Sequence, residues 1–414
     1  MKKTILLLAT ASLAPALQAQ TPVTVSTGGG SVEQHWYSLQ NDVAGVAALD
    51  EWDLAFEMAG FTSAIRVNAA KGLVAYETPN AITDWDNVNS VDTANWTLVQ
   101  DSDSSWSVSA LSNGNNLSNP DGLNVGWGDY NMITHVITGT KIYAILLADG
   151  TTWKKLRINA LASGIFSFTY ANLDGSGTQE ASLSKTGFTG KNFGYWSFAT
   201  NGTLDREPLA TDWDLLFTKY VQLTPYVYPV VGVLLNKEVT ALQVDGVPSA
   251  QALWSTGTFS EAINVLGSDW KTYDFAQSTY VMAADRTYFV KDVPGNIWKV
   301  VFTGFGGSAN GNISFTKEMM SAVGVGENTA QQHHLFAWPN PVTDGQARLV
   351  LDLPVNEALV RVFNTAGQQV AQQPWTGLAG LTTRTLDVGG LAKGVYMVRV
   401  DAAGTSTSTK LVIE

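Results

Sequence analysis

The chain has 414 residues and no cysteine. Disulfide bonds, thiolate metal sites and lipid attachment through a cysteine behind an N-terminal leader are therefore excluded. Histidine is scarce as well, with four copies, and only 14 % of the residues are charged. Beyond the N-terminus no apolar run reaches membrane-spanning length, so we expect no transmembrane segment in the mature chain. Packing and hydrogen bonds alone must hold the fold.

The few charges are unevenly distributed. The net charge is −12, and residues 20–334 carry −14, because residues 1–19 contribute +2 and residues 335–414 are neutral. An acidic surface repels phosphate backbones and anionic lipid headgroups. We therefore expect no nucleic-acid partner.

Residues 1–19 have the pattern of a cleavable signal peptide. Lys2 and Lys3 precede a mostly apolar run at residues 5–17, which is too short for a stop-transfer helix. Ala19 supplies the small residue at the cut, although Leu17 stands where a second small residue is usual. We expect export and cleavage after Ala19.

The remaining sequence predicts an all-β protein. Short runs rich in aliphatic and aromatic residues occur at 141–147, 154–158, 166–170, 361–363 and 394–400. Asp149-Gly150 between the first two runs predicts a hairpin turn. A helical period of 3.6 residues is not sustained anywhere over three turns.

An internal repeat sets the organisation of the chain. Residues 36–39 (W-Y-S-L) and 51–56 (E-W-D-L-A-F) recur as 195–198 (Y-W-S-F) and 212–217 (D-W-D-L-L-F). Toward the ends of the two copies, Trp153 aligns with Trp298. We therefore predict repeat one at 20–185, repeat two at 186–321, a Gly- and Gln-rich linker at 322–334 and a last domain at 335–414.

The W-D-L-x-F element predicts a buried strand. The alternation of a strand places Trp52, Leu54 and Phe56 on one face and Asp53 on the other. We expect the aromatic residues to form core, and Asp53 and its counterpart Asp214 to cap a turn or accept a backbone hydrogen bond.

The last domain resembles the type A C-terminal sorting domain of the type IX secretion system of Bacteroidetes. The matching segments are residues 338–341 (W-P-N-P), 360–370, 386–400 and 409–412. The resemblance implies an Ig-like β-sandwich that the outer-membrane translocon recognises. It also implies a location outside the cell or on the outer-membrane surface, reached through the periplasm.

The tandem repeats resemble the HmuY family, whose founding members capture haem at the cell surface. The matching segments in repeat one are 51–56, 65–68, 130–137, 143–150 and 153–158, and in repeat two 212–220, 232–236 and 298–302. The resemblance implies two HmuY-like β-rich domains. Haem is the ligand that it suggests, but the sequence shows no convincing pair of axial ligands.

Haem iron takes an axial ligand from histidine, methionine, tyrosine or cysteine. His135 is the best candidate here and Met132 the next, with Tyr280 as a replacement for His135 in repeat two. His35 precedes the first aromatic strand, and His333 and His334 fall in the linker. The alternative is that His135, as a lone histidine, has a structural role and binds no ligand.

Three further tryptophans are candidates for stacking on a ligand such as haem or a surface glycan. Trp85, Trp96 and Trp106 lie in the loop-like stretch 79–128 and lack obvious counterparts in repeat two. A core position is the alternative for each of them.

Motifs for catalysis and for metal binding are missing. The sequence has no G-x-S-x-G, H-E-x-x-H, P-loop or dinucleotide-binding fingerprint. Asp101 and Asp103 lie in a Ser-rich loop that is more typical of solvated chain than of a Ca²⁺ site. We expect a non-enzymatic surface binding protein with haem as a possible cofactor; the alternative is an adhesion or structural protein without haem.

Overall fold

A computed structural model describes residues 20–59, 62–115, 123–321, 335–338, 340–353, 357–365, 367–378, 380–402 and 405–414. The predicted signal peptide (1–19) and linker (322–334, with His333 and His334) lie outside the described residues. Contacts divide the chain into residues 1–321 and 322–414. Strands dominate both units, which confirms the all-β prediction.

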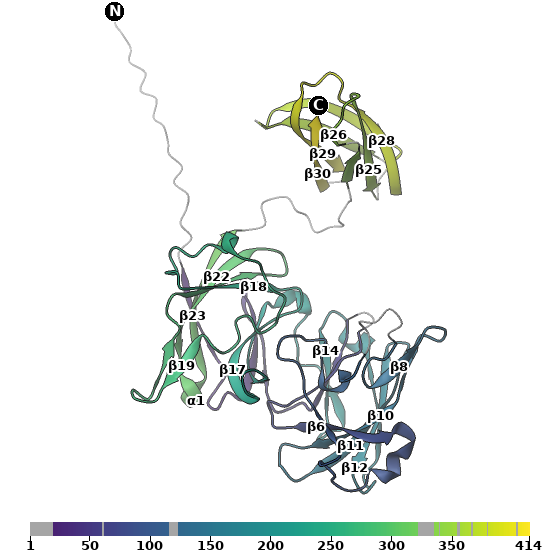
Figure 1. The fold of residues 1–414 in the computed structure, drawn as a ribbon, viewed down its shortest axis with the longest axis vertical. Coiled ribbons are helices and arrows are strands. Elements are labelled where there is room, and N and C mark those ends of the chain that lie inside the picture. Colours follow the sequence, from purple (N-terminus) through teal and green to yellow (C-terminus); the bar gives the residue numbers. More distant parts are fainter. Residues whose placement is uncertain are drawn as a thin grey trace, which may run out of the picture. The chain divides into compact units, whose positions relative to one another are not determined.

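Residues 20–321 form two lobes, each a sandwich of two sheets (Figure 1). In the first lobe an eight-stranded sheet faces a four-stranded one. The larger sheet contains β6 (Val74–Ala81), β7 (Thr97–Val99), β8 (Gly128–Asn131), β9 (Val136–Gly139), β10 (Lys141–Leu146), β11 (Trp153–Ala162), β12 (Ile165–Asn172) and β13 (Gln179–Ser184). The smaller contains β4 (Leu54–Glu57), β5 (Ile65–Val67), β14 (Phe193–Ser197) and β15 (Gly202–Leu204).

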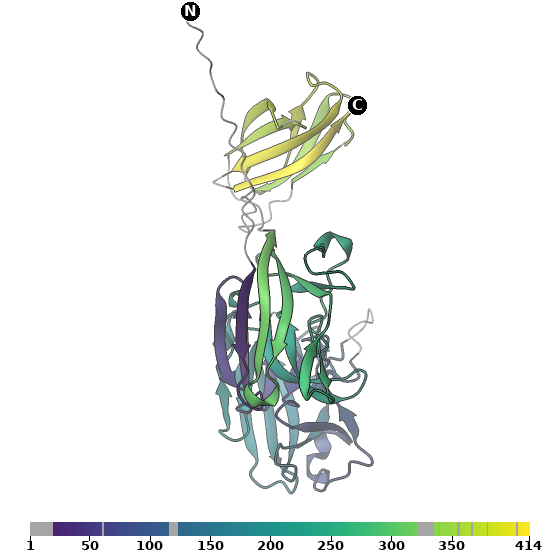
Figure 2. The same ribbon diagram turned by 90° about the vertical axis from the view of Figure 1, so that its left-hand side faces the viewer.

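The second lobe repeats this plan. Its five-stranded sheet contains β1 (Thr21–Ser26), β18 (Thr240–Asp245), β21 (Arg286–Lys291), β22 (Ile297–Phe305) and β23 (Asn312–Ser321). Its four-stranded sheet contains β2 (Glu33–Ser38), β3 (Asp42–Ala48), β16 (Leu215–Gln222) and β17 (Tyr228–Leu235). The hairpin of β19 (Lys271–Asp274) and β20 (Thr279–Met282) and the single-turn helix α1 (Gly307–Asn310) complete it. Figure 2 shows the purple N-terminal strands beside the green late strands, as β1 pairs with β23.

The two repeats exchange strands at their N-terminal ends: β1, β2 and β3 of repeat one join the second lobe, and β14 and β15 of repeat two join the first. Strand β2 of repeat one pairs with β16 of repeat two, and β14 of repeat two pairs with β4 of repeat one. The registers are equivalent: Tyr37 faces Leu215, and Trp196 faces Leu54. Both pairings cross the predicted boundary between residues 185 and 186. Each lobe therefore depends on strands that the sequence places in the other repeat.

A buried carboxylate fixes each exchanged strand. The backbone N–H of Phe198 donates to Asp53 Oδ2 at 2.6 Å, and the N–H of Leu39 donates to Asp214 Oδ2 at 2.7 Å. The predicted backbone role of both aspartates is thus confirmed. Lys71 Nζ also pairs with Asp53 at 2.7 Å.

Alternation along β4 and β16 separates two apolar surfaces. Leu54 and Phe56 enter the core of the first lobe, and Leu215 and Phe217 enter that of the second. The preceding tryptophans, Trp52 and Trp213, are buried as expected. They do not share the face of the leucine and phenylalanine, however, because each strand begins only at its leucine. They are buried instead in separate clusters between the lobes.

Residues 335–414 form a sandwich of their own around one apolar core. One sheet contains β24 (Leu335–Trp338), β25 (Gln346–Leu353) and β28 (Gly380–Asp387). The other contains β26 (Glu357–Asn364), β27 (Gln369–Thr376), β29 (Gly394–Ala402) and β30 (Thr405–Ile413). In the described part of the chain no helix is long and apolar enough to cross a membrane.

Candidate functional site

Trp106 connects the two lobes. It extends from a loop of the first lobe and packs in both clusters between the lobes. Its indole N–H donates to Leu235 O of the second lobe at 2.7 Å, and its ring lies 5.8 Å from that of Phe193. The half-buried ring is thus held by the protein itself on several sides.

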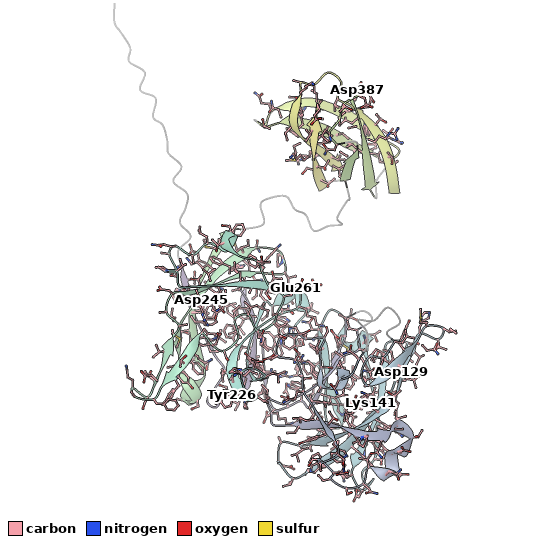
Figure 3. All side chains as sticks on the ribbon, viewed as in Figure 1. Asp129, Lys141, Tyr226, Asp245, Glu261 and Asp387 are labelled. Atoms are coloured by element: carbon pink, nitrogen blue, oxygen red, sulfur yellow. The ribbon has the colours of Figure 1, made fainter. Side chains whose placement is uncertain are left out.

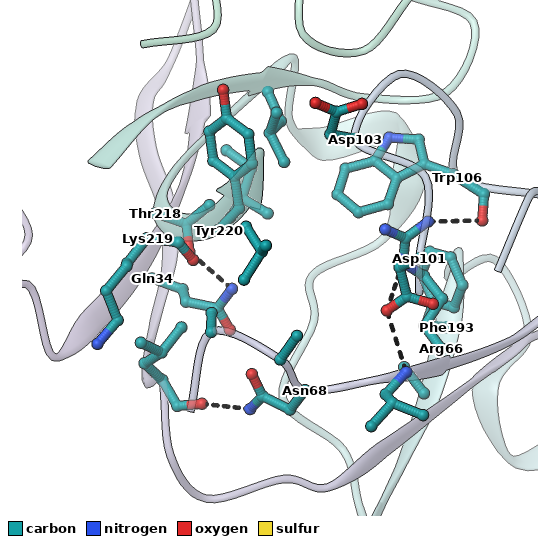
Figure 4. A pocket seen from close by; sticks show the side chains of 18 of the residues that line it. Gln34, Arg66, Asn68, Asp101, Asp103, Trp106, Phe193, Thr218, Lys219 and Tyr220 are labelled. Carbon is teal, nitrogen blue, oxygen red and sulfur yellow. Dashed lines mark hydrogen bonds and ion pairs between the residues drawn. The ribbon is translucent and has the colours of Figure 1, made fainter. Parts of the chain in front are cut away.

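A cavity of about 100 Å³ lies beside Trp106 at this junction (Figure 4). Thr218 and Tyr220 of β16 form one wall, Trp106 and its loop the opposite wall, and Gln34 part of the floor. Polar groups at the floor form hydrogen bonds within the protein. Gln34 Nε2, for example, donates to Thr218 Oγ1 at 2.9 Å. This cavity is a small, aromatic-lined space inside a structural interface.

Arg66 holds the Ser-rich loop that precedes Trp106 through hydrogen bonds to its backbone. Its guanidinium donates to the carbonyl oxygens of Ser102, Ser105 and Trp106 at 2.8–3.1 Å. Asp101 accepts the backbone N–H groups of Val67 and Ala110. Burial raises the pKa of Asp101, against the effect of Arg66. The oxygen atoms that a Ca²⁺ ion would need are thus bound to protein donors, and no group of three metal-ligating side chains occurs among the described residues.

A buried acid lies on the same cavity. Glu207 accepts the Tyr195 hydroxyl at 2.7 Å and the N–H of Asn192 at 3.0 Å. Burial raises the pKa of Glu207 to about 7, although these donors, Lys237 and Arg206 all favour the ionised form. The neighbouring Arg206 donates to Gln34, so this segment joins the two repeats.

We predict that Glu207 makes stability fall as pH rises from about 4.5 to 7. The folded protein retains the proton up to pH 7, whereas the unfolded chain releases it near 4.5, so protonation favours folding in this window. The raised pKa corresponds to about 3 kcal/mol. Glu207→Gln mimics the protonated acid and does not titrate. The difference in free energy of unfolding between this variant and wild type, measured in urea, should therefore rise by about that amount from pH 5 to pH 8, in favour of the variant. The exposed Glu261→Gln is the control; a relative stability of Glu207→Gln that does not change with pH would refute the assignment.

His135 borders a second and larger space, which we call the His135 groove. It has a volume of about 840 Å³. Apolar and polar side chains line it together, among them Val108, Val125, Tyr130, His135, Ile137, Leu161 and Lys185. The Tyr130 hydroxyl lies 2.7 Å from His135 Nδ1 and so fixes the ring, which leaves Nε2 for another partner.

Lys185 supplies a cation at the wall of the His135 groove. Its amine donates to Thr62 O at 2.6 Å and lies 5.6 Å from the Phe166 ring. Burial lowers its pKa. Lys185 and Tyr130 could not be recognised as groove residues from the sequence, because only the fold brings them to His135.

His135 and Met132 both lie in the turn of the hairpin β8–β9, but only His135 lines the groove. Met132 is 68 % exposed at the tip and does not line the groove. Hairpin β19–β20 is its equivalent, because Tyr130 pairs with Ile137 as Tyr273 pairs with Tyr280.

This register identifies the counterpart of His135 in repeat two. It is Ser278, and both residues have positive φ, 57° and 51°. Tyr280 corresponds instead to Ile137, so the expected replacement of His135 by Tyr280 is wrong. Repeat two therefore has no imidazole at the position where repeat one has one.

The other two stacking candidates lie on the outer face of the large sheet of the first lobe. Trp96 is buried at 8 % exposure, in contact with the rings of Tyr76 and Trp153. Trp85 is half-buried, and Lys155 and Arg157 lie over its ring at 4.8 and 4.9 Å. Neither lines the junction cavity or the His135 groove. The structure thus does not bring Trp85, Trp96 and Trp106 together.

Comparisons with known proteins show the family of the C-terminal domain. Residues 337–414 match the family described as "Secretion system C-terminal sorting domain". No curated protein matches the chain. Among solved structures, PorZ, a surface component of the type-IX secretion system of Porphyromonas gingivalis, is 10 % identical. The alignment covers 98 % of this chain and 61 % of PorZ, with a TM-score of 0.16, so this likeness supports neither a fold nor a function.

The predicted sorting domain is thereby confirmed. Its sandwich begins with β24 at Leu335, two residues before the match starts. Proteins with such a domain are handled by the type IX secretion machinery. Residues 337–414 thus make this chain a secreted or cell-surface protein that is exported through the periplasm.

Proposed function

We propose that the chain is a non-enzymatic binding protein that takes a flat, largely apolar ligand of haem size into the His135 groove. The carrying observation is the combination of that groove with one imidazole, which a tyrosine hydroxyl holds at its edge. The resemblance of both repeats to the HmuY family makes haem the first ligand to test. Removal of residues 1–19 and export would place the groove outside the cell.

The groove is large enough for the proposed ligand. Ligand pockets of proteins have volumes of roughly 300–1,000 Å³ and mostly apolar walls with a few polar groups. The His135 groove, at about 840 Å³, lies within this range. Val125, Ile137 and Leu161 would contact the porphyrin, and Lys185 would lie near a carboxylate of its edge.

The donor set supports a single axial ligand. Histidines that bind metals usually engage their second ring nitrogen in a hydrogen bond, which orients the ring. Tyr130 does this for His135. Among the described residues that line the groove there is no second histidine and no methionine, and the hydroxyl of its tyrosine, Tyr130, is bonded to His135. We therefore propose coordination by His135 alone, and Met132 takes no part.

Hemin titration of the purified chain tests this function. We expect a Soret shift in wild type and none in His135→Ala, because the substitution removes the one imidazole of the groove. Tyr130→Phe should weaken binding by about tenfold, since it frees the ring without removing the ligand.

His35→Gln is the matched control, because it removes an imidazole that pairs with Glu33 far outside the groove. It should titrate as wild type does. Haem binding would be refuted if excess hemin gave no shift, or if His135→Ala bound hemin as tightly as wild type.

An adhesion role is the second candidate. It is favoured by exposed aromatic side chains on the hairpin β19–β20, which do not line the His135 groove.

A further inference from the structure

An exposed aromatic face lies at one end of the second lobe. We define it by Tyr226, Tyr228, Tyr273, Phe275 and Tyr280. Phe275 is 87 % exposed, Tyr226 77 % and Tyr228 60 %. Figure 3 labels Tyr226 at the end of the lobe where Figure 1 places β17, β19 and α1. Several exposed aromatic side chains at one end of a lobe indicate a binding surface.

The hairpin β19–β20 builds most of this face. Tyr273 and Tyr280 lie opposite each other on the two strands, with ring centroids 5.1 Å apart at 66°. Phe275 meets Tyr273 edge-on at 5.0 Å, and Tyr280 meets Phe305 in the same way at 4.7 Å. None of these rings is stacked flat on its neighbour, so each pair covers a face of one ring only.

Tyr226 and Tyr228 extend the aromatic face from the connection between β16 and β17. Tyr228 pairs with Gln222 at the end of the β16–β17 ladder, so the connecting residues reach beyond the sheet. The phenols of Tyr228 and Tyr273 lie near Tyr280, and after burial they contribute to its raised pKa. In Figure 1 strands β17 and β19 lie at the same end of the second lobe, which brings the two segments to one side of the molecule.

The hydroxyl groups of this face differ from those of several core tyrosines. Buried Tyr37, Tyr143 and Tyr195 each donate a hydrogen bond to a protein acceptor. Within the described part of the chain, by contrast, the hydroxyls of Tyr226, Tyr228, Tyr273 and Tyr280 make no hydrogen bond to the protein. Covering them with an acyl chain or an apolar protein surface would remove their water without replacing its hydrogen bonds, which costs free energy.

Charges around the face exclude an anionic partner. The segment 223–230 has no charged side chain, and residues 271–282 contain only Lys271 and Asp274. The Lys271 amine turns inward, where it donates to Val231 O and lies 4.1 Å from the Trp270 ring. Asp274 accepts the N–H of Ala276. Asp269, next to the hairpin, is exposed. The face therefore presents no free cation.

We propose that the aromatic face binds a neutral polysaccharide. Sugar rings have apolar C–H faces that suit exposed phenyl rings, and hydroxyls that can exchange hydrogen bonds with the free phenols. A neutral polymer also meets no repulsion from the acidic body. This site is independent of the His135 groove, which lies in the first lobe.

The first lobe supplies an internal control. Asn131 and Asp274 cap the tips of the two equivalent hairpins in the same way. Met132 occupies the place of Phe275, and Ile133 beside it is 90 % exposed. Substitutions at this tip change an equally exposed hairpin without touching the aromatic face.

The test is affinity electrophoresis of the full chain in gels that contain dextran, mannan, a β-glucan or the acidic polymer alginate. We expect at least one neutral polymer to retard wild type, with binding at least about tenfold weaker in Phe275→Ala/Tyr226→Ala. The control Met132→Ala/Ile133→Ala should behave as wild type. Tyr226→Phe/Tyr228→Phe should bind more weakly than wild type, because it keeps the rings and removes two hydroxyls.

Several outcomes would overturn the proposal. They are no retardation by any neutral polymer, equal retardation of the Phe275→Ala/Tyr226→Ala variant, or retardation by alginate alone. Concentration-dependent dimers in light scattering that the same variant abolishes would assign the face to a second copy of the chain. Binding to phosphatidylcholine vesicles that the variant abolishes would assign it to a membrane surface.

Discussion

A fragment of residues 20–185 will not fold on its own. It contains repeat one as the sequence defines it, but it lacks β14, which pairs with β4 in the first lobe. It also keeps β2, whose partner β16 is then missing. An unpaired strand exposes its backbone groups and an apolar face, which favours aggregation. We expect no cooperative unfolding transition from this fragment in urea.

A fragment of residues 49–208 should behave differently, although it has nearly the same length. It contains every buried residue of the first lobe's core, from Leu54 to Trp196. It loses only contacts to the second lobe, such as the ion pair between Glu57 and Lys237. We expect cooperative unfolding with reduced stability, as followed by circular dichroism. A folded 20–185 together with an unfolded 49–208 would contradict the strand exchange.

Removing the Asp214 carboxylate should destabilise residues 20–321 by about 3 kcal/mol or more. Asp214 accepts the N–H of Leu39 at 2.7 Å, and Ser38 and the N–H of Val293 also hydrogen-bond to it. Asp214→Ala leaves these buried donors without an acceptor, at about 1–3 kcal/mol for each. Asp214→Asn keeps one oxygen and should cost less. Urea unfolding at pH 7.5 measures both.

Asp212→Ala is the control for this substitution. Asp212 is two residues away and exposed, so its loss should change the free energy of unfolding by less than about 0.5 kcal/mol. If Asp214→Ala also stayed within 1 kcal/mol of wild type, the hydrogen bonds to the exchanged strand would not be what holds it.

Local patterns of the sequence predicted much of the fold. The alternation and turn residues between 141 and 170 correspond to β10, β11 and β12, and Gly150 has the positive φ that its turn requires. The repeat predicted two equivalent lobes with equivalent aspartates. These features depend on neighbouring residues, which is why a single sequence reveals them.

Features that depend on long-range pairing were not predicted. Trp153 and Trp298 match in sequence, but Tyr143 pairs with Leu156 and Tyr288 with Val300, which offsets the tryptophans by one residue. A bulge between Ile297 and Trp298 accompanies this offset. Trp298 is therefore buried in a lobe core, whereas Trp153 is half-buried on the outer face of its sheet.

The candidate site shows the same limit. His135 was identified by residue type alone. The groove beside it is assembled from segments as distant in sequence as Ser63 and Lys185. Its partner Tyr130 is brought within hydrogen-bond distance by the register of the hairpin, which the sequence pattern does not reveal. The exchange of strands could not be inferred either, because the paired strands β2 and β16 are almost 180 residues apart, and periodicity does not encode partners.

The most direct test of the account is the stoichiometry and spin state of hemin on the full chain. Only repeat one has an imidazole at the groove position, and Ser278 replaces it in repeat two. The account therefore predicts one hemin per chain, with the high-spin ferric signal of a single axial histidine in electron paramagnetic resonance. Two hemins per chain, a low-spin signal from paired ligands, or no binding would contradict it.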